Sequence, residues 1–149
     1  RRKYYEGCQF ISSVAFSPDG MNVVDRTFSE THVWDLRNLS NPVAQHEVLW
    51  FPGQMNWLAN EGCVKETFRT SFTRDKKVVT GNYSADFITW DWENDNVQKH
   101  RAVSARTPRQ PPEPGRDFTK RVTCAEGHPT TDLVAVVSTA ALFVFQKKQ

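Results

Sequence analysis

The sequence predicts an all-β fold of the β-propeller class, and three observations lead to this prediction. An apolar run ends at Phe16 in a Ser-Pro-Asp-Gly turn, a second apolar run follows, and a third closes on Trp34 and Asp35. The same frame returns between Phe72 and Trp90, with the same interval of eighteen residues, so the two copies are expected to align without a gap. Such turns between short apolar runs indicate an antiparallel meander, and a meander repeated every 40–50 residues or so is typical of a propeller blade.

The composition fits a folded chain and argues against a membrane segment or a nucleic-acid surface. Five Trp and ten Phe among the 149 residues supply bulky core side chains. No run reaches the roughly 18 apolar residues of a membrane helix, and a net charge of +2 is too small for a nucleic-acid footprint. Three widely spaced cysteines without a CxxC pair favour a reducing, intracellular compartment over a disulfide framework.

The first unit is expected over residues 10–51. Its first hairpin turns at Pro18-Asp19-Gly20, where Pro fixes φ and Gly accepts a positive φ without steric cost. A polar loop at 25–30 separates the second strand from the third, and Pro52-Gly53 ends the fourth. The expected strands are at 10–16, 21–24, 31–34 and 43–51.

Two further units follow, at 63–100 and 117–146, with expected strands at 63–72, 78–80 and 87–90, and at 117–125, 133–137 and 142–145. Between them, residues 94–115 are rich in Asn, Arg and Pro, which excludes a helix or an interior strand and indicates an exposed linker. We place the Pro-rich linker proper at 101–116. Three blades cannot close a ring, because propellers have about four to eight. The chain is therefore expected to be a piece of a larger protein.

No catalytic centre, metal site or cofactor site is predicted. The zinc-protease, dinucleotide-binding, P-loop and nucleophile-elbow motifs are all absent. Cys124 and His128 have the spacing of two metal ligands but lack a third and fourth nearby. His46 and Glu47 are adjacent in an expected strand, so their side chains point to opposite faces and cannot share a site.

Binding by loops on a rigid scaffold is the remaining kind of function. The loops at 25–29, 81–86 and 138–141 each join the second and third strands of a unit, so they are expected to share one rim, together with the connection at 54–62. Exposed aromatic side chains with an arginine suit a binding hot spot. The alternative is that Phe28 and Tyr83 only pack the loops. The candidate partner-binding residues are Arg26, Phe28, Trp57, Asn82 and Tyr83.

A series of motifs runs in order along the whole chain, and in this order it resembles the C-terminal third of the B-type regulatory subunits of protein phosphatase 2A, a family of seven-bladed WD40 propellers. Generic WD40 repeats would explain residues 16–35 but not the order of the remaining motifs. The matching segments are Ile11-Ser12-Ser13, residues 16–36, Pro42-Val43, His46-Glu47, Thr80-Gly81-Asn82-Tyr83, Asp117-Phe118-Thr119-Lys120-Arg121, His128-Pro129, and residues 133–146, which close on Leu-Phe-Val-Phe-Gln.

The resemblance implies about three blades of such a propeller and a non-catalytic role without a cofactor. Members of the family dock on phosphatase scaffold and catalytic subunits and recruit phosphoprotein substrates, and neither nucleic acid nor a membrane is implied. The cytoplasm is the expected location, with the nucleus as an additional one. Within 58–68, this sequence departs from the substrate-facing groove of the family, so no substrate contact is assigned there; the departing residues are Ala59, Gly62, Lys65 and Thr67.

Two other classes of function stay open. The chain could serve as a generic WD40 scaffold of another complex, which the proteins that copurify with it would distinguish. It could also be a propeller hydrolase that uses rim residues, although the sequence shows neither clustered histidines nor paired acids.

Overall fold

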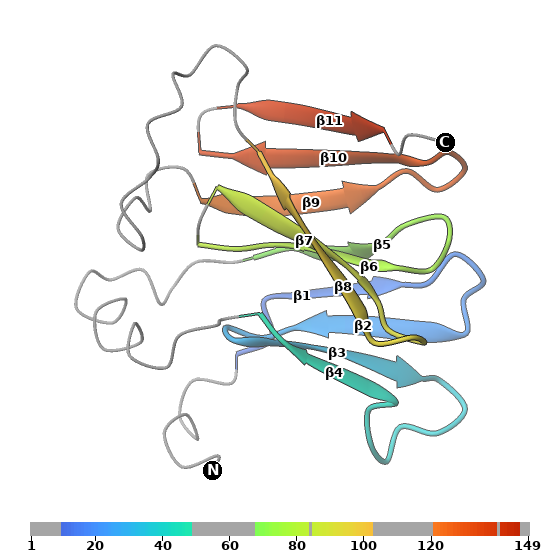
Figure 1. Cartoon of the computed structure of the whole chain (residues 1–149). Coiled ribbons are helices and arrows are strands. Elements are labelled where there is room, and N and C mark those ends of the chain that lie inside the picture. Colours follow the sequence, from blue (N-terminus) through green and yellow to red (C-terminus); the bar gives the residue numbers. More distant parts are fainter. Residues whose placement is uncertain (1–9, 49–67, 84, 103–120, 140, 147–149) are drawn as a thin grey trace.

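The structure is a computed structural model that describes residues 10–48, 68–83, 85–102, 121–139 and 141–146. In this part of the chain eleven strands form three antiparallel sheets and no helix occurs, which confirms the all-β prediction (Figure 1). The first sheet contains β1 (Ser13–Phe16), β2 (Asn22–Arg26), β3 (Glu30–Asp35) and β4 (Ala44–Glu47). The second contains β5 (Thr70–Phe72), β6 (Val78–Gly81), β7 (Asp86–Asp91) and β8 (Asn96–Arg101). The third contains β9 (Val122–Gly127), β10 (Leu133–Ser138) and β11 (Leu142–Gln146).

Each sheet is a meander whose strands follow one another in chain order. The first and third sheets lie within the predicted units, and the second extends one residue beyond its unit, to Arg101. The strand β8 corrects the expectation that residues 94–115 are an exposed linker, because β8 lies within that range. It forms because the edge of β7 accepts six paired residues, from Asp91 opposite Asn96 to Asp86 opposite Arg101. Residues 103–115 of the expected linker lie outside the described residues.

The first two sheets do not align without a gap. Phe16 lies opposite Val23 in the first hairpin of one sheet, whereas Phe72 lies opposite Val78 in the other, so this hairpin is one residue shorter in the second sheet. The next hairpin is one residue longer, so that Trp90 regains the position opposite Val78. The two changes cancel, which is why the Phe-to-Trp interval in the sequence conceals them.

The shorter turn still needs a residue with positive φ. Gly20 has φ 69° in the first sheet, and Lys76 has φ 60° in the equivalent position of the second. Lys76 also forms an ion pair with Asp19, which joins the two turns. The pair and two hydrogen bonds, from the hydroxyl of Ser17 and the amide of Met21, hold the pKa of the Asp19 carboxyl well below its usual range.

The first and second sheets pack face to face. Val24 and Val33 of the first sheet meet Phe72, Val78 and Trp90 of the second, and all five are at least 95% buried. Burial of an apolar side chain of this size stabilises a fold by about 1.5–3 kcal/mol. Trp90 is therefore a packing residue.

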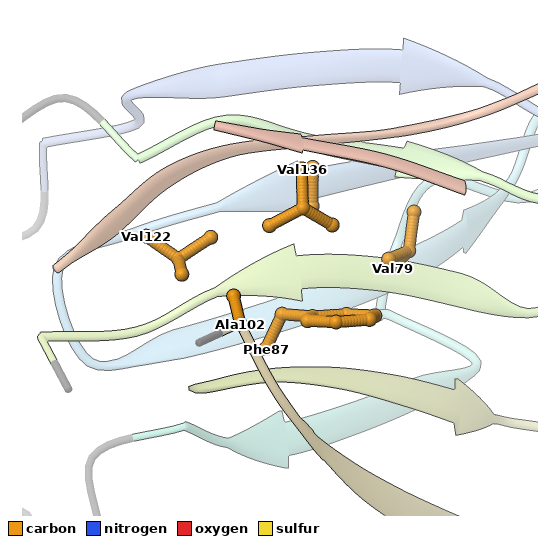
Figure 2. Packing of buried hydrophobic residues seen from close by; sticks show 6 residues of the cluster. Val79, Phe87, Ala102, Val122 and Val136 are labelled. Carbon is orange, nitrogen blue, oxygen red and sulfur yellow. The ribbon is translucent and has the colours of Figure 1, made fainter. Parts of the chain in front are cut away.

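A second apolar cluster lies between the second and third sheets (Figure 2). Val79 and Phe87 come from β6 and β7, whereas Val122 and Val136 come from β9 and β10. The ring of Phe145 in β11 packs 4.8 Å from that of Phe87. The three sheets thus form one continuous stack with two apolar layers.

The second and third sheets approach closely where β5 and β6 meet β9, the first strand of the third sheet; we call the first strand of each sheet (β1, β5 and β9) its innermost strand. The backbone amide of Arg69 donates directly to the carbonyl of Thr123, at 2.8 Å. A Cβ added at Gly81 would lie 2.0 Å from the carbonyl oxygen of Val122, and one added at Gly127 would lie 2.5 Å from that of Phe72. Glycine is required at both positions because the neighbouring backbone occupies the place of a side chain.

Serine hydroxyls join the innermost strands of the first and second sheets. The hydroxyl of Ser12 donates to the carbonyl of Phe68 at 2.7 Å, and the amide of Thr70 donates to the hydroxyl of Ser13 at 3.1 Å. A serine hydroxyl also joins the second and third sheets, where Ser71 accepts from the amide of Gly127 at 2.9 Å.

We expect Gly81→Ala to destabilise the chain by at least the 1–3 kcal/mol or so of an overpacked core, because the new methyl group collides with backbone at Val122. Thermal and urea unfolding would measure the loss. Gly20→Asn is the matched control, since Gly20 faces open space and asparagine tolerates positive φ. Equal stability of G81A and the wild type would contradict the close approach of the two sheets.

Candidate functional site

The predicted loops gather at one end of the stack. The β2–β3, β6–β7 and β10–β11 hairpins lie on the same side in Figure 1, opposite the β1–β2 and β5–β6 turns. We call this side the hairpin end. The arrangement follows from the meander order, because every second connection of an antiparallel sheet returns to the same edge. The connection at 54–62, which was expected to reach the same rim, lies outside the described residues.

Three of the candidate residues form one cluster at the hairpin end. Arg26 is the last residue of β2, and Phe28 follows it in the hairpin. The rings of Phe28 and Tyr83 lie 5.5 Å apart, so this cluster joins the first sheet to the second. Asn82 positions it, since its side chain accepts from the amide of Tyr83 at 2.7 Å and its Nδ2 lies 3.5 Å from the carbonyl of Val48. Trp57 lies outside the described residues.

The expected exposure of these side chains is wrong. Arg26 has no exposed surface, Tyr83 is 2% exposed and Phe28 is 7% exposed. The alternative stated above, that Phe28 and Tyr83 pack the loops, describes what they do. The reason is that both hairpins fold against each other between the sheets, so their aromatic side chains find apolar surface there instead of water.

Two residues that the sequence analysis did not select complete the site. The guanidinium of Arg26 lies over the ring of Phe68, 5.4 Å from its centre, and Phe68 in turn meets Tyr83 edge-on at 4.5 Å. His46 packs 5.3 Å from Trp90 of the second sheet. His46 alternates with Ala44 and Val48 on one face of its strand, a pattern in the sequence that marks it as inward-facing.

Arg26 carries a buried positive charge, and no carboxylate pairs with it among the described residues. Its three guanidinium nitrogens are buried and have no hydrogen-bond partner in the described part of the chain. Burial lowers the pKa of Arg26 to about 10, while the nearby Tyr83 acts in the opposite direction. The group stays protonated at neutral pH. An uncompensated buried charge costs several kcal/mol.

A different polar network lies on the other face of the first sheet. The carboxylate of Asp25 bridges two partners: the Nδ1 of His32 and the indole N–H of Trp34, both at 2.7 Å. The second ring nitrogen of His32 lies 3.3 Å from a carboxylate oxygen of Glu30. The hydrogen bond to Asp25 raises the pKa of His32, partly offset by burial. The network holds the ring of Trp34 in place.

A groove separates the outer strands of the second and third sheets. Phe87, Val134 and Phe145 form its apolar wall, and Lys77 and His100 lie at its polar side. The Nε2 of His100 lies 2.9 Å from the hydroxyl of Thr89, and burial lowers the pKa of His100. No carboxylate partner orients His100 in the described structure, so the groove lacks an acid–base arrangement of the triad kind.

No protein-family model matches the chain. Within the described ranges, no group of three or more His, Cys, Asp or Glu side chains could hold a metal ion. The same residues include no helix with the length and apolarity needed to span a bilayer. The described site thus consists of hairpin loops at the surface and a charged, aromatic cluster buried beneath them.

We expect the His32–Asp25 pair to make stability depend on pH. Because the folded pKa of His32 is raised above its ordinary 6.5, its contribution is fully present below that value and is lost as the pH rises through the folded pKa. Thermal unfolding between pH 5 and 9 would measure this for the wild type and for His32→Gln.

Buried His46 and His100 have lowered pKa values and act with the opposite sign, so the informative quantity is the difference between the two profiles. The stability advantage of the wild type over H32Q should be largest at low pH. A difference that is independent of pH would contradict the ion pair.

Proposed function

We propose that the chain is part of a WD40 β-propeller that acts as a non-catalytic regulatory subunit of a protein phosphatase 2A-type Ser/Thr phosphatase. In this role it binds the scaffold and catalytic subunits and recruits phosphoprotein substrates with loops at the hairpin end. The repetition of one sheet-to-sheet interface along the stack is the observation that carries the propeller part of the proposal. The order of sequence motifs carries the phosphatase part.

The stacked interfaces support a propeller because the outer face of the first sheet repeats a face that is covered in the second. Phe16 and Trp34 hold the positions that Phe72 and Trp90 hold in the second sheet. Phe72 is 5% exposed because the first sheet covers it, whereas Phe16 is 67% exposed. A further sheet packed on the first would bury Phe16 in the same way, and propellers repeat this step until the ring closes.

The third sheet supports the same conclusion from the other end of the stack. It has three strands in the described structure, whereas the other two sheets have four. Leu142 and Val144 of β11 are 66% and 63% exposed, on a strand whose far edge is unpaired within the described residues. Exposed apolar strands at a sheet edge invite pairing with another strand, which a complete blade would supply.

The phosphatase assignment rests on the resemblance of the ordered motifs to the B-type regulatory subunits. Two of these motifs, Thr80-Gly81-Asn82-Tyr83 and Leu142-Phe143-Val144-Phe145-Gln146, now have structural roles. Gly81 permits the close approach of two sheets and Tyr83 closes the Arg26 cluster. The last motif is β11, whose Phe145 packs on Phe87.

The hairpin end is the proposed partner surface. Arg26, Phe28 and Tyr83 shape it from within, Asn82 fixes the second hairpin, and Trp57 is retained as a contact residue from sequence. A generic WD40 scaffold of another complex is the second candidate, because the same stack of sheets would serve it equally well.

We expect the tagged intact protein to copurify with a Ser/Thr phosphatase catalytic subunit and its scaffold. Affinity purification followed by mass spectrometry would test this. The purified chain alone should hydrolyse no phosphoester, because the proposed role is to position substrates for another subunit.

Two other results would count against the proposed phosphatase role. A reproducible complex without any phosphatase subunit would favour the generic scaffold. Turnover of a phosphoester or glycoside by the purified chain would contradict the non-catalytic role.

A further inference from the structure

The space between the first two sheets contains three polar groups without partners. Besides the guanidinium of Arg26, the Nε2 of His46 and the indole N–H of Trp90 are buried and have no hydrogen-bond partner among the described residues. Natural proteins leave few buried polar groups unpaired, and each such case needs an explanation. Here the unpaired groups occur between the same two sheets.

The three groups face the interface between the first two sheets, and we call the region that they line the chamber. Arg26 lies opposite Thr31, and Thr31 lies opposite His46, so these side chains form one row on the face that meets the second sheet. The ring of His46 lies 5.3 Å from that of Trp90 across the interface. Burial lowers the pKa of His46, the charge of Asp95 opposes this effect, and the charge of Arg26 adds to it. His46 is thus neutral at pH 7, and Arg26 supplies the one positive charge.

The equivalent row of the second sheet contains different residues, so the polar row of the first sheet does not repeat from sheet to sheet. There Gly81, Phe87 and His100 take the places of Arg26, Thr31 and His46. Gly81 lies too close to Val122 to accept even a methyl group. The second sheet thus has glycine and phenylalanine where the first sheet has Arg26 and Thr31. The polar row is therefore a specific feature of the first interface.

We propose that this chamber is an anion site that takes a single carboxylate, supplied by an aspartate or glutamate side chain of a partner protein. A carboxylate forms a bidentate pair of hydrogen bonds with a guanidinium and accepts further hydrogen bonds from other N–H groups. The Nε2–H tautomer of His46 and the indole of Trp90 are donors of this kind.

The charge balance selects a carboxylate over a phosphate group. A carboxylate neutralises the single charge of Arg26, whereas a phosphate dianion would leave a net negative charge buried between the sheets. Burying an unpaired charge is strongly unfavourable. The occupant is thus a monoanion.

Access is through the hairpin end. The guanidinium of Arg26 lies over Phe68 and near Tyr83, and the rings of the hairpin residues Phe28 and Tyr83 lie 5.5 Å apart. Rotation of these two side chains opens the chamber without breaking a strand pair. An acidic side chain would enter between them and leave its own backbone over the hairpins, on the surface proposed above for partner binding. The inference rests on that display role but not on the phosphatase assignment.

Thermal unfolding of the whole chain in matched concentrations of sodium chloride, acetate and phosphate tests the site directly. Acetate should raise the Tm of the wild type above its value in chloride in a saturable way. Arg26→Met should lose this shift and, in chloride, should have a Tm equal to or above that of the wild type, because the variant removes an unpaired buried charge. Arg37→Met is the matched control, since Arg37 pairs with Asp35 at the surface and should keep the acetate shift.

Three results would overturn the proposal. An acetate shift that persists in R26M would place acetate elsewhere, and a larger shift with phosphate than with acetate would contradict a monoanion site. A markedly lower Tm of R26M in chloride would mean that Arg26 already has a partner within the chain.

A measurement on the wild type covers the case in which R26M does not fold. Titration with acetate should move the indole N–H resonance of Trp90 and the ring resonances of His46, and an absence of both shifts would overturn the site. None of these readouts involves a phosphatase, so failure here is distinguishable from failure of the copurification experiment.

Discussion

The distance between neighbouring sheets, set at their innermost strands, is the constraint on which the rest of the structure depends. Between the second and third sheets this distance is minimal, because Gly81 and Gly127 let backbone meet backbone. Between the first and second sheets, Ser12 and Ser13 place hydroxyl groups in the gap. Apolar layers fill both interfaces, and the row with the buried charge of Arg26 lies in the first of them.

Local sequence chemistry accounts for most of the fold. Pro18-Asp19-Gly20 and the alternation before Trp34 and Trp90 predicted the hairpins because turn residues and apolar period act over a few neighbours. The strand β8 could not be predicted in the same way. Its residues are mostly polar, and it forms because β7 offers an unpaired edge and Val97 reaches the apolar layer. Pairing across strands overrides the weak preference of the segment itself.

The site was predicted in part, and the limit has a physical cause. The repeated position of the hairpins indicated that Arg26, Phe28 and Tyr83 would lie at one rim, and the structure places them together at the hairpin end. Their burial depends on how two sheets pack, which a single strand pattern does not encode. The different hairpin lengths of the first and second sheets could not be predicted for the same reason. They become visible only in the strand pairing, where Phe72 lies opposite Val78.

The central claim is that the sheets form a single stack joined at their innermost strands, and native-state hydrogen exchange tests it most directly. The amide of Arg69 donates to Thr123, and the amide of Val122 donates to Asn82, so both bonds cross from one sheet to the other. We predict that both amides exchange as slowly as those of Val79 and Val136 in the cores of their sheets, through global unfolding alone. Fast exchange at Arg69 and Val122 while Val79 and Val136 stay protected would mean that the sheets separate independently, which would contradict the account.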